Sequence, residues 1–331
     1  MPKYSFIIPV YNRPDEVEEL LESLTKQNYT NFELIVVEDG STIDCKNIVE
    51  KYRQKLCIEY VVQPNGGPSV ARNRGAEIAR GDYFIFLDSD VIVPENYLQI
   101  VDENVESRLL QCFGGPDASH PSFTPIQKAI SHSMTSVLTT GGIRGKKESM
   151  DKFYPRSFNM GISREAFVKV NGFSDMRFGE DVDFSMRLIE NNFKAGLIKE
   201  AFVYHKRRTT FKSFFKQVYN SGIARINLEK RHKGTMKLVH ILPALFFLGN
   251  VFLIMLACFF PVFVGLLLLP AIAFFADALV ATKNLRVALL AVPAAYVQLC
   301  GYGCGFCECF VRRVVLGKGE FSRFVKNFYK K

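Results

Sequence analysis

The chain has 331 residues, a formal net charge of +9 and 48% hydrophobic residues. That length exceeds one average domain, and the apolar residues concentrate in the last third, which argues against a single globular domain. The basic residues gather beside the apolar stretches, at 206–208, at 230–233 and in the last twenty residues. This position favours attraction to anionic lipid headgroups, so we expect membrane lipids and no nucleic acid as partners.

Apolar runs alternate with helical patterns in the first ninety residues. The runs are Tyr4–Val10, Phe32–Val37, Ile58–Val62 and Tyr83–Leu87. They are short and rich in Ile, Val, Phe and Tyr, as buried strands are. Apolar residues at helical spacing between the first two runs, and a segment opened by Gly66-Gly67-Pro68, predict helices. This alternation predicts a mostly parallel sheet that binds ligands beyond the carboxyl ends of its strands.

An Asp88-Ser89-Asp90 triplet stands where the fourth run ends. Two carboxylates at the carboxyl end of a buried strand suit a hard divalent cation that faces a diphosphate. The triplet therefore indicates nucleotide-sugar chemistry.

Three other parts of the sequence place polar residues at the ends of predicted elements. They are Ser5 to Arg13, Glu33 to Ser41, and Gly66 to Gly75. The third leads through a helix into the strand before Asp88. A later part joins Asn171-Gly172-Phe173 to Phe178-Gly179-Glu180-Asp181-Val182-Asp183 and Arg187.

Residues 211–237 follow as an amphipathic segment and linker. Phe211, Phe214 and Val218 fall on one face, with lysines interleaved. The pattern favours a helix that lies in the membrane interface, and an ordinary amphipathic helix packed on a domain is the alternative.

The last third is a hydrophobic region over residues 238–311. Residues 238–276 contain no Asp, Glu, Lys or Arg, which is close to the ~40 residues that two membrane-crossing helices need. We expect segments near 238–259, 262–281 and 287–310, then a basic tail at 312–331.

The orientation of these segments follows from charge. The N-terminus shows no secretory signal, so we expect an integral membrane protein of a bacterial inner or plasma membrane with its globular part in the cytosol. Three crossings would place the basic tail outside, against the positive-inside tendency. We therefore expect a two-helix hairpin, then a re-entrant or in-plane segment at 287–310 that is broken at Gly301, Gly303 and Gly305.

Together the polar segments resemble glycosyltransferase family 2, the inverting nucleotide-sugar transferases with a GT-A fold. The resemblance covers roughly residues 2–208, and four pieces in the same order on the predicted elements are specific, although each is weak alone. It implies a Rossmann-like α/β catalytic domain over residues 1–210, followed by C-terminal transmembrane helices. It also implies an enzyme that moves a sugar from a nucleotide-sugar donor.

Carried over position by position, the resemblance implies a donor site. Asp39 would accept a hydrogen bond from the ring N-H of a uracil-like base, and Arg72 would lie near the nucleotide or its phosphates. Pro9, Tyr11 and Ser89 would also contact the donor. Turn chemistry at Asp39 and a solvated helix position at Arg72 are the competing interpretations.

The same resemblance implies a bound Mg²⁺ or Mn²⁺. Asp90 would touch the ion directly, and Asp88 would contact the ribose or a metal-bound water. His205 matches a position of a further metal ligand, but a lone histidine at a strand end is as often structural. The ion would neutralise the charge that develops on the leaving nucleoside diphosphate.

Asp181 would be the general base that takes the proton from the acceptor hydroxyl, in one displacement that inverts the sugar configuration. Glu180 is expected on the acceptor side. The alternative is that Glu180 and Asp183 cap a helix that starts near Val182, with Asp181 as a third acid of its first turn.

Two departures from the family pattern matter. The second strand ends in Glu38-Asp39 where Asp-Asp is usual. Processive membrane synthases of the family bind the growing glycan with a Gln-x-x-Arg-Trp motif, whereas this chain has no Trp. Gln217 begins at best a remnant of this motif, and we expect it on the acceptor side. The loss of the motif favours the addition of one or a few sugars.

We expect the acceptor to be a lipid-linked glycan or polyprenyl phosphate in cell-surface polysaccharide assembly, because the apolar segments hold the domain near the bilayer. A dehydrogenase is disfavoured, since the first strand lacks a following Gly-x-Gly-x-x-Gly turn. A non-catalytic membrane protein with a GT-A-like domain and a short-chain polysaccharide synthase stay open as alternatives.

Overall fold

The computed structural model describes residues 1–140 and 153–324, and it divides into two compact units. The first unit consists of residues 1–120 and 149–206, and the second of residues 121–148 and 207–331. Residues 121–140, which the sequence analysis placed in the catalytic domain, thus belong to the second unit. Residues 325–331 of the expected basic tail lie outside the described residues.

The first unit contains a seven-stranded mixed sheet. Its strands run in the order β3 (Ile58–Gln63), β2 (Phe32–Asp39), β1 (Tyr4–Val10), β4 (Tyr83–Leu87), β8 (Asn159–Ser163), β6 (Cys112–Gly114) and β9 (Ala195–Leu197). The first four are parallel to one another, whereas β8 is antiparallel to both β4 and β6. The predicted α/β class and the four N-terminal strands are confirmed.

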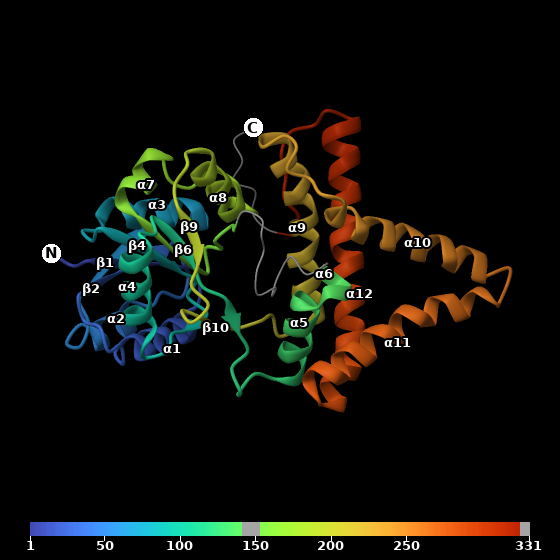
Figure 1. Ribbon diagram of the computed structural model, residues 1–331, viewed down its shortest axis with the longest axis horizontal. Coiled ribbons are helices and arrows are strands. Elements are labelled where there is room, and N and C mark those ends of the chain that lie inside the picture. The colour runs from blue at the N-terminus through green and yellow to red at the C-terminus, as the bar shows by residue number, and fades with distance from the viewer. Residues whose placement is uncertain (141–152, 325–331) are drawn as a thin grey trace. The chain divides into compact units, whose positions relative to one another are not determined.

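Helices cover both faces of this sheet (Figure 1). One face is covered by α1 (Pro14–Leu24), α2 (Lys46–Tyr52) and α4 (Tyr97–Arg108), whose apolar side chains form one buried cluster with the strands. The other face is covered by α3 (Pro68–Ile78), α7 (Arg164–Lys169) and α8 (Glu180–Glu190), which share a second cluster. Burial on both faces explains why the parallel strands are almost continuously apolar.

A small three-stranded sheet extends the first unit beyond β4. It contains β5 (Val91–Ile92), β10 (Val203–His205) and β7 (Asp117–Ala118). The antiparallel register of β10 and β5 pairs His205 with Val91. Because Val91 directly follows Asp90, this pairing brings His205 to the Asp88-Ser89-Asp90 triplet.

The second unit is helical. It contains α5 (Pro125–Thr135), α6 (Val137–Thr140), α9 (Phe211–Arg231), the short η1 (Leu238–His240), α10 (Leu242–Ala257), α11 (Phe263–Thr282), α12 (Leu285–Cys309) and the π-helical turn η2 (Phe310–Val315). Among the described residues, Phe263–Thr282 and Leu285–Val315 are long and apolar enough to cross a membrane, and α10 is a shorter apolar helix. In Figure 1, α10 and α11 form a hairpin that leads into α12.

The expected break in the last apolar segment is wrong. Helix α12 continues through Gly301, Gly303 and Gly305. A Cβ atom at Gly305 would lie 2.0 Å from the backbone oxygen of Tyr219 on α9, and one at Gly303 would lie 2.6 Å from the backbone oxygen of Pro243 on α10. These glycines therefore permit close contact between helices instead of ending one.

Helix α9 packs against α12 through its buried side. Phe214, Val218 and Ile223 are buried on it, and a Cβ at Gly222 would lie 2.2 Å from the backbone oxygen of Tyr302. This packing accounts for the apolar face of α9. The location of α9 in a membrane interface stays a prediction.

Candidate active site

Hydrogen bonds join the four polar segments into one continuous structure. The Asn12 side-chain oxygen accepts from the backbone N-H groups of Thr42 and Ile43, at 2.8 and 3.0 Å, which ties the end of β1 to the loop after β2. The Asn73 side chain on α3 exchanges two 2.8 Å hydrogen bonds with the backbone of Phe173. Contacts of this kind place residues from distant parts of the sequence at the carboxyl edge of the sheet.

Asp39, at the end of β2, connects the second segment to the third. Its buried carboxylate accepts from the backbone N-H groups of Gly66 and Gly67, both at 2.8 Å. It also accepts from the side chains of Gln63 at 2.7 Å and Asn65 at 3.3 Å. A carboxylate has about four acceptor positions, so Asp39 fixes the loop that leads into α3.

Glu38, the departure from the family pattern, has a similar structural task. Its buried side chain accepts from the backbone N-H of Cys45 at 2.9 Å and from the Tyr60 hydroxyl at 3.1 Å. The Ser41 hydroxyl donates to it as well. The longer glutamate therefore organises the loop between β2 and α2.

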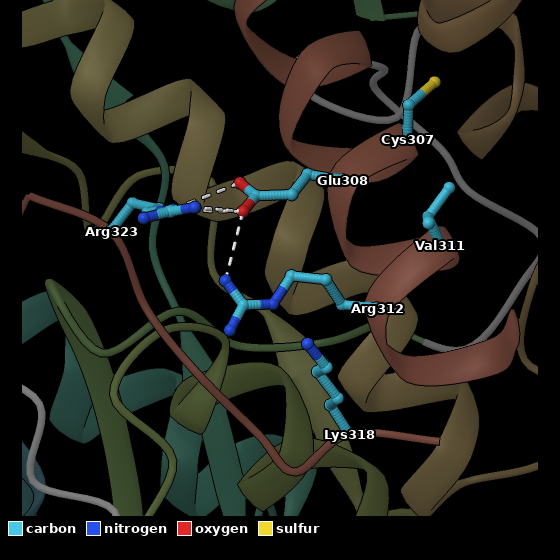
Figure 2. Close-up of a pocket in the computed structure, with 6 residues that line it drawn as sticks. All are labelled: Cys307, Glu308, Val311, Arg312, Lys318 and Arg323. Carbon is cyan, nitrogen blue, oxygen red and sulfur yellow. Dashed lines mark hydrogen bonds and ion pairs between the residues drawn. The ribbon is translucent and has the colours of Figure 1, made fainter. Parts of the chain in front are cut away.

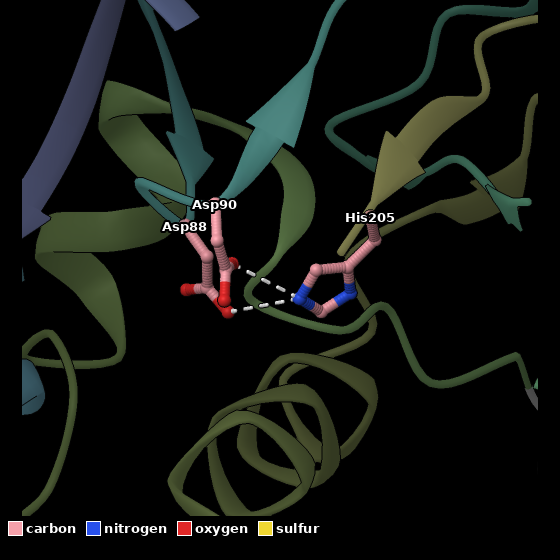
Figure 3. A group of neighbouring side chains, drawn as sticks. All are labelled: Asp88, Asp90 and His205. Atoms are coloured by element: carbon pink, nitrogen blue, oxygen red, sulfur yellow. Dashed lines mark ion pairs between the residues drawn. The ribbon is translucent and has the colours of Figure 1, made fainter. Parts of the chain in front are cut away.

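Asp88, Asp90 and His205 form an acidic cluster with an imidazole at its edge (Figure 3). His205 Nε2 lies 3.2 Å from Asp90 Oδ1 and 4.0 Å from Asp88 Oδ2. One candidate ligand atom from each residue lies within 4.8 Å of the others. The His205 ring also stacks on Phe158, with ring centroids 4.9 Å apart. Two carboxylates and one imidazole at this spacing fit a divalent cation.

Arg72 links this cluster to the last motif. Its buried guanidinium lies 2.8 Å from Asp88 Oδ1 and 3.0 Å from Glu180 Oε1. Burial alone would lower the pKa of Arg72, but the two carboxylates outweigh it and raise the pKa. Arg72 is thus a permanent cation between the Asp-Ser-Asp triplet and the start of α8, not a solvated helix residue.

Asp181 lies in the first turn of α8, next to Glu180. Gly179 is the N-cap and has no side chain that could cap the helix, while Asp181 Oδ1 accepts from the backbone N-H of Val182 at 2.8 Å. Two acids of this turn also pair with arginines, since Asp181 Oδ2 lies 2.5 Å from Arg156 Nε and Asp183 pairs with Arg187. The alternative of a helix-capping role for Glu180 and Asp183 stays open. The positive end of the helix dipole favours their charged forms.

The pKa values of Glu180 and Asp181 move in opposite directions. Burial would raise the pKa of Asp181, but the neighbouring Arg156 outweighs burial and lowers it. Burial and the charge of Asp181 raise the pKa of Glu180 in spite of Arg72. Neighbouring carboxyl groups with divergent pKa values are typical of catalytic sites.

The other predicted residues lie as follows. Ser89 is buried within the triplet and Tyr11 is exposed, while Pro9 pairs with Val37 across β1 and β2. Gln217 lies on α9 in the second unit.

Sequence reasoning missed three residues of the site. Arg13 Nη1 lies 3.5 Å from Asp90 Oδ2. Arg156 pairs with Asp181, and Phe158 stacks on the ring of His205. Arg13 stood within the first motif, so its charge was a usable signal. Arg156 and Phe158 follow an irregular stretch, and no local pattern marks them.

The sheet order and the acidic cluster at its carboxyl edge define a transferase domain of the GT-A type. The model of the family described as Glycosyl transferase family 2 matches residues 5–170. The chain belongs to this family.

Curated relatives agree with this assignment. An uncharacterized glycosyltransferase, EpsJ of Bacillus subtilis, is 28% identical over 213 residues, which cover 62% of this chain and 61% of EpsJ. An uncharacterized glycosyltransferase of Haemophilus influenzae is 30% identical, with 62% of this chain and 70% of the relative covered. The chain thus spans less than two thirds of the length of EpsJ.

Solved structures share the fold. Residues 1–349 of TarS from S. aureus, in complex with UDP-GlcNAc, match with a TM-score of 0.51 and 20% identity, covering 96% of this chain and 92% of that one. The mannosyltransferase PcManGT from Pyrobaculum calidifontis, in complex with GDP-Man and Mn²⁺, matches with a TM-score of 0.57 and 15% identity, covering 94% and 88%.

Proposed function

We propose that the chain is a membrane-associated, metal-dependent, inverting glycosyltransferase. It moves one or a few sugars from a nucleotide-sugar donor to a lipid-linked glycan or polyprenyl phosphate in cell-surface polysaccharide assembly. The observation that carries this proposal is the continuous set of contacts from Asp88 and Asp90 through Arg72 to Glu180 and Asp181. Donor, cation and base would then share one site.

The donor would lie along the carboxyl edge of the sheet. Asp39 would read the base by accepting a ring N-H in place of its longest contact, the 3.3 Å hydrogen bond from Asn65. Arg72 and Arg13 would face the diphosphate. Proteins of similar structure were solved with UDP-GlcNAc and with GDP-Man. The test below therefore varies both the base and the sugar of the donor.

Asp88, Asp90 and His205 would hold Mg²⁺ or Mn²⁺, and the imidazole nitrogen favours Mn²⁺. When bound, the ion would neutralise the charge that develops on the leaving diphosphate. His205 and Asp90 are oriented by the β5–β10 pairing and by the stacking on Phe158. The fold therefore holds these side chains close together, which supports their proposed role as ligands.

Asp181 would accept the proton of the acceptor hydroxyl. Its lowered pKa keeps it ionised at neutral pH, as a base must be. An acceptor that brings a phosphate oxygen needs less help from a base, and Arg156 beside Asp181 would attract that phosphate. Both acceptor classes are thus compatible with this corner of the site.

A membrane-bound acceptor is supported by the apolar helices of the second unit. Helices that expose leucine, phenylalanine and valine along their length need lipid or a partner to cover them. The catalytic domain would stay in the cytosol, where nucleotide sugars are made.

The test uses full-length protein in detergent with a panel of UDP- and GDP-sugars, a lipid extract and Mn²⁺ or Mg²⁺. The release of nucleoside diphosphate is measured, and the product linkage is then solved. We expect Asp90→Ala and Asp181→Asn to lower the transfer rate by about 10²- to 10³-fold, because each removes a group that acts on the reacting atoms. Chelation of the cation should stop transfer.

The matched control is Asp15→Asn, which removes an exposed acid from the first turn of α1. It should transfer at the wild-type rate. If Asp90→Ala and Asp181→Asn also matched the wild type, the catalytic proposal would be wrong. Equal use of soluble acceptors by a chain truncated before Leu238 would refute the lipid acceptor alone.

A further inference from the structure

A basic hollow lies in the second unit, at the C-terminal end of α12 (Figure 2). It has a volume of 590 Å³ and is lined by Cys307, Glu308, Val311, Arg312, Lys318 and Arg323. Three cationic side chains thus face one carboxylate. The hollow is formed by α12, the π-helical turn η2 and the segment after it.

The carboxylate in the hollow is already engaged. Arg323 donates hydrogen bonds to the Glu308 carboxylate from Nε and Nη2, and Arg312 Nη1 lies 3.3 Å from Glu308 Oε1. The hydroxyl of Tyr219 on α9 donates to the other oxygen at 2.5 Å. Glu308 therefore holds the arginines in place, and it leaves the hollow with a net positive charge.

Lys318 supplies a positive charge that is not paired with any of the described residues. Its ammonium makes no ion pair with the described residues, and in Figure 2 it points toward Arg312. Arg312 itself stacks on the ring of Phe321, with 4.1 Å from its guanidinium carbon to the ring centroid. One exposed ammonium and one held guanidinium on the same side suit the oxygens of a phosphate.

The segment that carries Lys318 and Arg323 is anchored, so the hollow is preformed. The buried side chain of Asn220 on α9 accepts from the backbone N-H of Arg323 at 2.9 Å and donates to its carbonyl oxygen at 2.8 Å. The Lys318 backbone N-H donates to the Arg312 carbonyl oxygen at 2.9 Å, and Glu320 pairs with Arg231 at 2.8 Å. A preformed site loses less entropy when an anion binds.

An exposed apolar strip borders the hollow. Val311, Val314 and Val315 are 49%, 50% and 64% exposed, and Phe310 and Leu316 are exposed beside them. A free inorganic anion would make no favourable contact with this apolar strip, whereas the hydrocarbon chain of a lipid would cover it. The polar hollow and the apolar strip together match an amphiphile with a phosphate head.

We propose that this hollow binds the phosphate headgroup of a membrane lipid whose acyl or prenyl chain lies along Val311 to Leu316. The proposal rests on the proposed membrane span of α12, and it does not depend on the transfer reaction. The site would fix the end of α12 at the membrane surface by a specific contact, beyond the general attraction of a basic tail.

The test is native mass spectrometry of the full chain in a maltoside detergent. The protein is titrated with phosphatidic acid, with phosphatidylcholine of the same acyl chains, and with inorganic phosphate. We expect phosphatidic acid to bind more tightly than the other two. Lys318→Gln should weaken it about fivefold, as expected for one lysine beside an anionic lipid.

The matched control is Arg286→Gln, which removes one exposed charge from the opposite end of α12. It should bind phosphatidic acid like the wild type, and so should Asp90→Ala, which separates this proposal from the catalytic one. Equal losses in Lys318→Gln and Arg286→Gln would reduce the effect to general charge attraction and overturn the site. Inorganic phosphate that bound as tightly as phosphatidic acid would overturn the lipid assignment. Unchanged thermal melting of Lys318→Gln shows that its fold is intact.

Discussion

The two units place charge and apolar surface in opposite ways. In the first unit, Arg72, Glu180 and Asp181 are buried, at 3%, 9% and 6% exposure, and most of the large apolar side chains are buried as well. In the second unit, large apolar side chains such as Phe259 and Val280 are 78% exposed. Burial of charge is costly unless it is paired, and exposed apolar surface is costly in water.

The difference indicates what each unit is built to contact. The first unit keeps its costly groups where they serve a polar ligand, at one edge of a water-facing fold. In the second unit, the polar network around Glu308 lies at the end of α12, whereas α10 and α11 expose large apolar side chains along their length. Each unit is therefore consistent with a different solvent, and substitutions that exchange these arrangements should have the largest effects.

The largest expected effect comes from Arg72→Met. The substitution removes the cation between Asp88 and Glu180 and leaves two carboxylates without it. Loss of one partner of a buried ion pair costs about 3–5 kcal/mol, so the melting midpoint of the protein should fall by roughly 10 °C. Donor binding, measured by calorimetry with UDP- and GDP-sugars, should be lost as well.

Arg74→Met is the control for this substitution. Arg74 lies on the same helix and pairs with Glu77, but both side chains are exposed. An exposed pair is worth about 0–1 kcal/mol, so Arg74→Met should melt close to the wild type. Equal melting of the two variants would mean that the Arg72 network adds nothing to the first unit.

The second prediction concerns the close helix contact in the second unit. Gly305→Ala would force a Cβ to within 2.0 Å of the Tyr219 backbone oxygen, so α9 and α12 must separate. Overpacking of this kind costs about 1–3 kcal/mol. The melting midpoint in detergent should fall accordingly.

Gly265→Ala in α11 is the matched control, because nothing lies within 4 Å of the position of its Cβ. Alanine favours the helix over glycine by about 1 kcal/mol, so this variant should be unchanged or slightly more stable. If Gly305→Ala behaved in the same way, the glycines would not be needed for helix contact.

These two sites also mark where sequence reasoning succeeded and where it failed. The strands β1 to β4 were predictable because each is a short and mostly apolar run, and the acidic triplet directly follows the end of β4. The role of Arg72 as a bridge was not, since Glu180 is 108 residues away in the sequence. Local patterns contain no information on such a pair.

The glycines of α12 were misinterpreted for a related reason. By local propensity, three glycines within five residues weaken a helix. The contacts with α9 and α10 stabilise the helix and need the missing side chains, but those partners lie more than fifty residues away in the sequence. Arg156 was missed for the same reason, because no local pattern in the sequence marks it as the partner of Asp181, which lies 25 residues away.

The smallest expected effect is a shift in pH dependence caused by Arg156→Gln. Arg156 lowers the pKa of Asp181 against the effect of burial, so its removal should raise that pKa. A general base works only when ionised. The acid limb of the transfer rate should therefore move to higher pH by the same amount, measured as kcat/KM between pH 4 and 8.

The conservative variant Arg156→Lys keeps the positive charge and should retain the wild-type acid limb. The ion pair of Asp181 with Arg156 should also make the stability of the fold depend on pH. It stabilises the fold at pH values above the pKa of Asp181 in the unfolded chain, which is about 3.9. This contribution is lost as the pH falls through the lower pKa of Asp181 in the folded state. A merely structural Arg156 would lower the rate of Arg156→Gln equally at every pH. An acid limb that stayed in place would thus remove Asp181 from the role of base, even if the overall rate fell.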